Sequence, residues 1–373
     1  MNCPTAAPLQ SGQAAELVLG QPSATTGTPN NPSFSGSTLS SPTGVVAEGG
    51  RLWVGDSGNA RVLQWNSAPA VNGQSASVAI GQPDLLTGTA GTTQDRTSNG
   101  LSFIARAGTK LLLSDTANNR VLIWNGIPTT SGQPADLVLG QTSFTTKASG
   151  NGASNLYGPA GIWTDGTRLV VAERFNNRVL IWNTFPTSNG VPADVVLGAS
   201  GFGTSPFVNP PTASSFRNPD GVAYDGTRLY VADVSNNRVL IWNGLPTTNN
   251  KPADVVIGQT GFDISFDNAG APYPQVNAIG MKGPSGVHVD ACGSLYVCDG
   301  SNGRVLVYTD VPTSNGAAAD AVAGKPNLTA QPNASAPASA AWMNGCSAVT
   351  VSGASLYATD TSFNRTLRFA LSR

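Results

Sequence analysis

The sequence predicts an all-β chain that folds as a six-bladed β-propeller of four-stranded antiparallel blades. Three observations support this prediction: a motif repeats six times, each of the first five copies contains four short strands and the sixth contains three, and one additional strand precedes the first copy. An arginine marks the repeat, and successive arginines lie 59, 58, 60, 66 and 61 residues apart. Such a period, kept along the whole chain, is typical of propellers and other repeat architectures. The arginines are Arg61, Arg120, Arg178, Arg238, Arg304 and Arg365.

The fourth copy shows how each repeat divides into strands. Its runs GVAY (221–224), RLYVAD (228–233), RVLIW (238–242) and DVVIG (254–258) are short and rich in Val, Leu, Ile and aromatic residues. Turn-forming residues bound each run, as expected of strands in an antiparallel sheet. Sheets arranged in a ring bury both faces against their neighbours. The predicted blades of this single domain are 42–82, 101–141, 159–199, 219–259, 284–325 and 346–371, the last completed by 15–21.

The N-terminal strand is predicted to close the ring. The run AELVLGQ at 15–21 matches DLVLGQ at 136–141, which is the fourth strand of the second copy. The sequence ends at 371–373, just after the third strand of the sixth copy. We therefore expect strand 15–21 to pair with the last blade, so that no raw sheet edge is left between the first and last blades.

A carboxylate lies five residues before each repeated arginine, and an aromatic residue ends each third strand. One active site needs one constellation, so six copies favour a structural role in which the carboxylate and the arginine hold the hairpin between the second and third strands. We interpret the aromatic residues as core fillers. The carboxylates are Asp56, Asp115, Glu173, Asp233, Asp299 and Asp360, and the aromatic residues are Trp65, Trp124, Trp182, Trp242, Tyr308 and Phe369.

These motifs resemble the NHL-repeat family. The stretch NPDGVAYDGTRLYVADVSNNRVLIW at 218–242 has the pattern P-x-G-V, an apolar strand that ends in Asp, and then N-x-R-V with an aromatic residue. The resemblance covers all six copies, although the second and sixth begin with GLSFI and GCSAV. It implies the propeller fold and says little about activity, because this fold serves recognition domains, lyases, lactonases and bacterial surface proteins.

Composition excludes several partners and favours export. Only 11% of the residues are charged and the net charge is −1, which argues against nucleic-acid binding. No apolar run is long enough for a transmembrane segment. The low lysine content and the four cysteines favour a secreted, periplasmic or cell-surface protein, although the chain shows no export signal. The blade positions predict the disulfides Cys298–Cys346 and Cys3–Cys292, and a lipid-modified Cys3 is the alternative to the second bridge.

Catalytic constellations are scarce. His288 is the only histidine, which excludes a three-histidine zinc site within the chain, and we interpret it as a packed residue of an innermost strand. Glu173 replaces the usual Asp, and Asp220 stands where the other copies have Thr, Ser or Ala. These two carboxylates could hold calcium at the channel mouth, as in a lactonase-, lyase- or hydrolase-like enzyme. This enzyme is the alternative function; otherwise we expect no cofactor.

The preferred function is that of an exported, non-enzymatic scaffold that binds a protein or glycan. Connections of roughly twenty residues, such as 140–161 and the aromatic-rich 262–276, follow the fourth strands and would gather on one face. Blade three differs most from the other blades there. We expect a ligand-binding site at Trp163, Glu173, Arg174, Phe175 and Asp220; local repacking is the alternative. The oligomeric state stays open.

Overall fold

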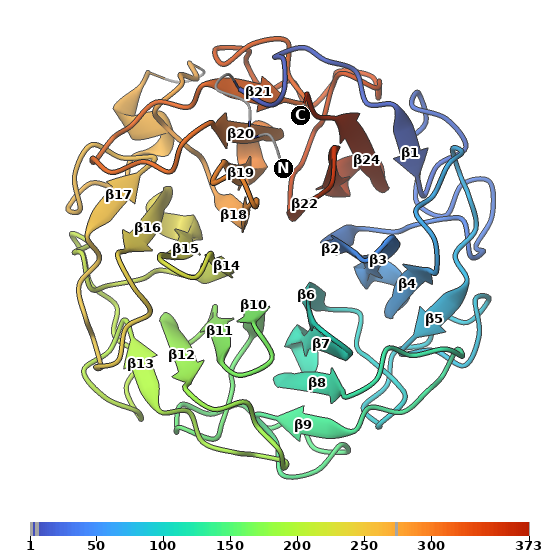
Figure 1. Ribbon diagram of the computed structural model, residues 1–373, viewed down its shortest axis with the longest axis horizontal. Helices are drawn as coiled ribbons and strands as arrows, with labels where there is room; N and C mark the ends of the chain where they lie inside the picture. Colours follow the sequence, from blue (N-terminus) through green and yellow to red (C-terminus); the bar gives the residue numbers. More distant parts are fainter. Residues whose placement is uncertain (1–2, 4–6, 273–274, 373) are drawn as a thin grey trace.

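The structure, a computed structural model, describes residues 3, 7–272 and 275–372 and contains six four-stranded antiparallel sheets arranged in a ring (Figure 1). In the first five sheets the strands follow chain order from the axis outward. The sixth has the order β22-β23-β24-β1. The predicted fold class is therefore confirmed.

The strands are three to seven residues long, and a short 3-10 turn follows the second strand in five of the blades. No helix in the described part of the chain is long and apolar enough to cross a membrane. The strands are β1 Leu17–Leu19, β2 Pro42–Glu48, β3 Arg51–Asp56, β4 Arg61–Trp65, β5 Val78–Ile80, β6 Leu101–Ala107, β7 Lys110–Asp115, β8 Arg120–Trp124, β9 Leu137–Leu139, β10 Pro159–Thr164, β11 Leu169–Glu173, β12 Arg178–Trp182, β13 Val195–Leu197, β14 Pro219–Tyr224, β15 Leu229–Asp233, β16 Arg238–Trp242, β17 Val255–Ile257, β18 Pro284–Val289, β19 Leu295–Asp299, β20 Arg304–Tyr308, β21 Ala321–Ala323, β22 Val349–Ser352, β23 Ser355–Asp360 and β24 Arg365–Ala370. The 3-10 helices are η1 Ser57–Asn59, η2 Thr116–Asn118, η3 Val234–Asn236, η4 Asp267–Gly270, η5 Gly300–Asn302 and η6 Thr361–Phe363.

The first strand closes the ring as predicted. β1 pairs antiparallel with β24, with Leu17 opposite Arg368 and Leu19 opposite Thr366. An isolated bridge between Gly20 and Thr38 then leads the chain toward the first blade. The N-terminal strand therefore covers the edge that the last blade would otherwise expose.

The repeated NNR sequence forms the corner between the second and third strands. Asn118 donates a hydrogen bond from its side chain to Asp115 (2.9 Å). Asn119 has a left-handed backbone with φ of 52°, which asparagine tolerates better than most residues. Its side chain donates to the Lys147 carbonyl (3.0 Å) and accepts from the Gly158 amide (3.0 Å). Each asparagine of the motif thus has a separate structural role.

The arginine of the motif connects its own blade to the loops around it. Arg238 Nε donates to Asp233 at 2.8 Å, and its other nitrogens donate to the carbonyls of Phe262, Thr212 and Ser215. Both side chains of the pair are fully buried. All six carboxylate–arginine pairs are buried in this way. The hydrogen bonds satisfy charges that would be costly to bury unpaired, and the structural interpretation of the motif is confirmed.

The apolar core lies between the blades. Six clusters of buried residues each join two neighbouring sheets. The aromatic residues that end the third strands are fully buried, and the Trp124 indole donates to the Gln133 carbonyl at 3.0 Å. These residues fill the core, as the sequence predicts.

The two faces of the ring carry different connections. The hairpin face carries the turns between first and second strands, which are 49–50, 108–109, 165–168, 225–228, 290–294 and 353–354. The loop face carries the 3-10 turns and receives the long connections from each outermost strand to the next innermost strand. These connections are 20–41, 81–100, 140–158, 198–218, 258–283 and 324–348.

The innermost strands converge toward the loop face. A Cβ atom on Gly161 would lie 2.1 Å from the Asp220 carbonyl oxygen, and one on Gly221 would lie 2.3 Å from that of Ser285. The backbones of neighbouring blades are too close there for a larger residue. Glycine is therefore required by the ring geometry at these two positions.

Two disulfides join blade five to its surroundings. Cys298, in β19, bonds to Cys346, which precedes β22, with the Cα atoms 5.2 Å apart. Cys3 bonds to Cys292 in the hairpin turn of blade five, with the Cα atoms 5.4 Å apart. Both pairs match the pairing that the sequence predicts. A lipid-modified Cys3 is incompatible with the second bridge.

Candidate functional site

Three of the five predicted site residues lie together at the loop face. Arg174 follows β11 and donates from Nε (3.0 Å) and Nη2 (2.7 Å) to Asp220 Oδ1 on the next blade. Phe175 is 53% exposed, and its ring centroid lies 4.9 Å from that of Tyr157. Burial raises the pKa of Asp220, although the Arg174 guanidinium opposes this shift. The junction of blades three and four thus presents an aromatic pair beside a partly exposed arginine.

Glu173 lies behind this cluster and has the same role as the aspartates of the other blades. Its carboxylate accepts hydrogen bonds from Arg178 (2.5 Å), Asn176 (2.8 Å) and the Tyr157 amide (2.8 Å), and the residue is fully buried. A metal ion could reach Glu173 or Asp220 only by displacing an arginine. Within residues 3, 7–272 and 275–372, no three His, Cys, Asp or Glu residues group closely enough to hold a metal ion.

Trp163 lies apart from the other predicted residues. In the β10–β11 hairpin, Glu173 is opposite Pro159, whereas Trp163 is opposite Val170. This register places Trp163 toward the hairpin face and Glu173 at the loop face. The expectation that Trp163 joins the loop-face residues is therefore not met, because the innermost strand runs from one face to the other between them.

Exposed aromatic side chains gather on the connections of blades three to five. In the described part of the chain, four large aromatic side chains are exposed: Tyr157, Phe175, Phe207 and Phe266. Each lies in a long connection or in a turn between the second and third strands. The Arg217 guanidinium lies 5.0 Å from the Phe207 ring centroid, within range of a cation–π contact.

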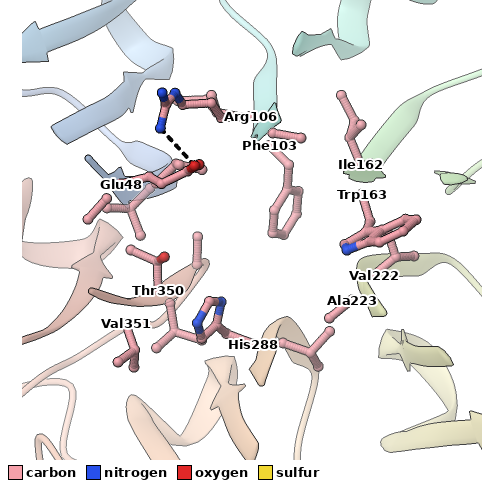
Figure 2. Close-up of a pocket in the computed structure, with 18 of the residues that line it drawn as sticks. Glu48, Phe103, Arg106, Ile162, Trp163, Val222, Ala223, His288, Thr350 and Val351 are labelled. Carbon is pink, nitrogen blue, oxygen red and sulfur yellow. Dashed lines mark ion pairs between the residues drawn. The ribbon is translucent and has the colours of Figure 1, made fainter. Parts of the chain in front are cut away.

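A cavity of about 330 Å³ occupies the hairpin-face half of the central channel. All six innermost strands line it (Figure 2). Five of these strands contribute only from their third or fourth residue onward, and β22, which begins later in its blade, contributes from its first residue together with the preceding Ala348. Phe103 stands where four of the other blades have the glycine of the P-x-G-V pattern. Its side chain points into the channel (Figure 2).

The cavity has a charged side and an aromatic side. Glu48 and Arg106 form an ion pair of 2.9 Å between blades one and two. Trp163 lies across the cavity from this pair (Figure 2) and packs edge-on against Tyr224, with ring centroids 5.1 Å apart. The charged side belongs to blades one and two and the aromatic side to blades three and four, so a ligand in the cavity would face both.

A second hollow continues from the aromatic side over the hairpin turns. It has a volume of about 360 Å³ and shares Trp163 and Tyr224 with the central cavity. Arg168 lies over both rings and donates to Asp165. Although partial burial opposes its charge, hydrogen bonds from Thr167 and Arg168 hold the pKa of Asp165 well below its usual range.

His288 lines the same cavity. It lies on β18 and is partly buried, with its ring centroid 6.4 Å from that of Tyr296. The sequence placed it at a blade interface or the channel, and it lies at the channel. The sequence analysis missed Glu48, Phe103, Arg106 and Tyr224. Only Phe103 carried a signal, because it breaks the P-x-G-V pattern.

Comparisons with known proteins agree with this architecture. A family model of the NHL repeat matches residues 39–65, and no curated protein sequence matches the chain. A solved protein of unknown function from Bacteroides thetaiotaomicron is similar over 95% of this chain and 75% of its own, with 14% identity and a TM-score of 0.52. Virginiamycin B lyase from Staphylococcus aureus is similar over 92% and 98%, with 11% identity and a TM-score of 0.45. These similarities concern the fold alone. The chain therefore folds as a six-bladed β-propeller and contains one stretch, residues 39–65, that matches the NHL repeat.

Proposed function

We propose that the chain is an exported, non-enzymatic recognition propeller that binds a protein or glycan through its loop face. The observation that carries this proposal is the group of exposed aromatic side chains Tyr157, Phe175 and Phe207 around the junction of blades three and four. Exposed aromatic residues beside arginines are typical of interaction surfaces, where they supply large contact areas.

Contacts between the connections support the proposal. The Gly203 amide donates to the Asn151 carbonyl at 2.7 Å, and Ser205 donates to the Asn176 side chain at 3.0 Å. The first bond ties the connection after blade three to the one before it, and the second ties it to the turn between β11 and β12. A surface held in this way loses less conformational entropy when a partner binds.

The chemistry of the surface favours a protein over a glycan. Phe175 and Tyr157 form an apolar contact surface next to the Arg174 guanidinium, and Phe207 is paired with Arg217. Tyr and Arg are, together with Trp, enriched in the energetic centres of protein interfaces. Glycan binding is the other outcome of the test.

Two features support export. Disulfides are formed and kept in oxidising compartments, and this chain has two. Asn327 and Asn333 each begin an Asn-x-Ser/Thr pattern, the acceptor sequence for glycosylation in secretory pathways, and both residues are exposed. A third pattern, at Asn364, is buried, and its side chain bonds to Gly27 and Ser41.

The test is a binding screen of the purified, oxidised protein against arrays of extracellular proteins and of glycans. Phe175→Ala should weaken binding at least tenfold, about 1.4 kcal/mol, with an unchanged melting temperature. Arg174 is replaced together with its partner, as Arg174→Ala with Asp220→Ser, because removing the arginine alone would leave a buried carboxylate unpaired.

The control is Phe266→Ala, on the connection between blades four and five. Binding that survives the changes at Phe175 and Arg174 but is abolished by Phe266→Ala would place the surface elsewhere and contradict the assignment to blades three and four.

A further inference from the structure

We propose that the central cavity at the hairpin face binds one neutral sugar ring. This site lies on the opposite side of the ring from the proposed recognition surface. It is independent of that surface, because Trp163 is the only residue named for both and the structure places it in the cavity.

The aromatic side of the cavity suits the apolar face of a sugar. Trp163 and Tyr224 form an edge-to-face pair, and the Tyr224 hydroxyl is held by a hydrogen bond to the Gly226 carbonyl (2.7 Å). Arg168 packs over both rings from the hairpin turn of blade three. The pair is thus supported from outside the cavity, and the C–H groups of a pyranose could pack against it.

The charged side suits neighbouring hydroxyl groups. Glu48 is half exposed, with 50% of its side chain accessible, and lies 2.9 Å from Arg106. The guanidinium also rests on the Trp53 ring, 5.4 Å from its centroid, which limits its movement. The carboxylate offers hydrogen-bond acceptors, and the guanidinium beside it offers hydrogen-bond donors. Two adjacent hydroxyls, each both donor and acceptor, match this arrangement.

The balance of charge favours a neutral ligand. Aromatic rings and a carboxylate attract cations, but Arg106 and Arg168 would repel one here. Glu48 and Asp165 would repel an anion. On the part of the cavity formed by blades five and six, the His288 imidazole and the Thr350 hydroxyl add polar groups.

The size of the cavity limits the ligand to about one ring. Its volume of about 330 Å³ is at the lower end of the range of about 300–1,000 Å³ for small-molecule sites. The aromatic hollow over the hairpin turns leaves room for a second unit to leave toward solvent. The terminal residue of a longer glycan would therefore fit.

The ring itself does not require the residues of this site. Blades two and four have Ala105 and Ala223 where blade three has Trp163, and blade one has Ala47 where blade two has Arg106. These blades pack normally with the smaller residue. Trp163 and Arg106 are therefore additions to the repeat, and both face the same cavity.

The experiment measures binding of single sugars to the full-length oxidised protein by calorimetry and by saturation-transfer NMR. The probes are glucose, galactose, mannose, xylose and N-acetylglucosamine, with glucuronate and glucosamine as charged counterparts. We expect at least one neutral sugar to bind in the millimolar range or tighter, and the charged counterparts to bind at least about tenfold more weakly.

Two variants restore the residue of another blade. Trp163→Ala and Arg106→Ala should each weaken sugar binding at least about tenfold while the melting temperature stays close to that of the parent protein. The matched control is Phe175→Ala, which should leave sugar binding unchanged because it alters only the loop face. The proposal is overturned if no neutral sugar binds, if a charged counterpart binds more tightly, or if both cavity variants bind as the parent does. A failure of partner recognition at Phe175 would not affect it.

Discussion

Two regions of each blade differ in how closely they repeat. The corner between the second and third strands is nearly the same six times, with a buried carboxylate–arginine pair in every blade. The innermost strand, by contrast, presents Val46, Ala105, Trp163, Ala223, His288 and Thr350 at one equivalent position. The repeated region joins strands to loops within the protein, whereas the variable region lines a cavity. The comparison separates residues that hold the ring from residues that line the cavity.

The largest effect is expected from breaking the ring. Deleting residues 1–21 removes β1 and exposes the edge of β24, so we expect aggregation or loss of the cooperative thermal transition. Because the deletion also removes Cys3, the full-length Cys3→Ser, Cys292→Ser variant serves as the control and should stay folded. A truncated protein that melts like the full chain would refute the role of β1.

The repeated corner should be costly to disturb. Arg238→Met leaves the fully buried Asp233 without its partner, and we expect the free energy of unfolding to fall by about 3–5 kcal/mol. Chemical denaturation measures this change. The double variant Asp233→Asn, Arg238→Met removes both charges and should be less destabilised than the single variant. A single variant within about 1 kcal/mol of the parent would argue against the structural role.

Lys325, which stands where four other blades have glutamine, should make the stability of the protein depend on pH. Burial lowers the pKa of Lys325 to about 8, and its ammonium donates to the Met343 carbonyl. The unfolded chain keeps the ordinary lysine pKa of 10.5 and so binds more protons between these values. Stability should therefore rise with pH in this window, by about 2 kcal/mol from pH 8 to pH 10.

Lys325→Gln should remove this rise in stability, because glutamine does not titrate. The substitution should be tolerated, because four blades have glutamine at the equivalent position, such as Gln82. Well below pH 8, Lys325 is protonated in both the native and the unfolded state, so its contribution to the unfolding free energy should not change with pH. The range above pH 10 is avoided because burial also raises the pKa of Tyr308. A parent protein whose unfolding free energy does not change between pH 8 and pH 10 would contradict the assignment.

The smallest effect is expected at the variable position. Thr350→Val changes a cavity-lining side chain of the innermost strand and should alter the free energy of unfolding by about 0.5 kcal/mol or less. The comparison with Arg238→Met under the same conditions tests the division between the two regions. A loss of several kcal/mol at Thr350 would show that the innermost strands also hold the ring.

The fold could be predicted because each repeated residue has a local structural role that is typical of its residue type. Asn119 adopts a left-handed backbone, Arg120 pairs with Asp115, and Trp124 caps the core. These roles depend on residues nearby in the chain, so the sequence pattern of each of the six copies is sufficient to predict them. The number of blades and the closing strand follow from counting the copies.

The site was predicted only in part, for two different reasons. Trp163 was misplaced because hairpin pairing sets it opposite Val170, away from Glu173. The ion pair of Glu48 and Arg106 was missed because these residues lie on different blades, and the pattern of a single blade does not reveal it. A cavity arises from the diameter of the closed ring, which no local pattern encodes. Arg174 and Asp220 were grouped correctly because both adjoin the loop face.

The N-terminal segment has a mechanical consequence. It is bonded covalently to blade five at Cys292, packs Leu9 into the core between blades five and six, and then forms β1 in the last blade. Tension applied at the N-terminus therefore passes through the Cys3–Cys292 bond into blade five before it reaches the hydrogen bonds of β1. When an oxidised molecule is pulled from this end, the pairing of β1 with β24 therefore bears no force. In a reduced molecule the force acts on this pairing, and β1 detaches first.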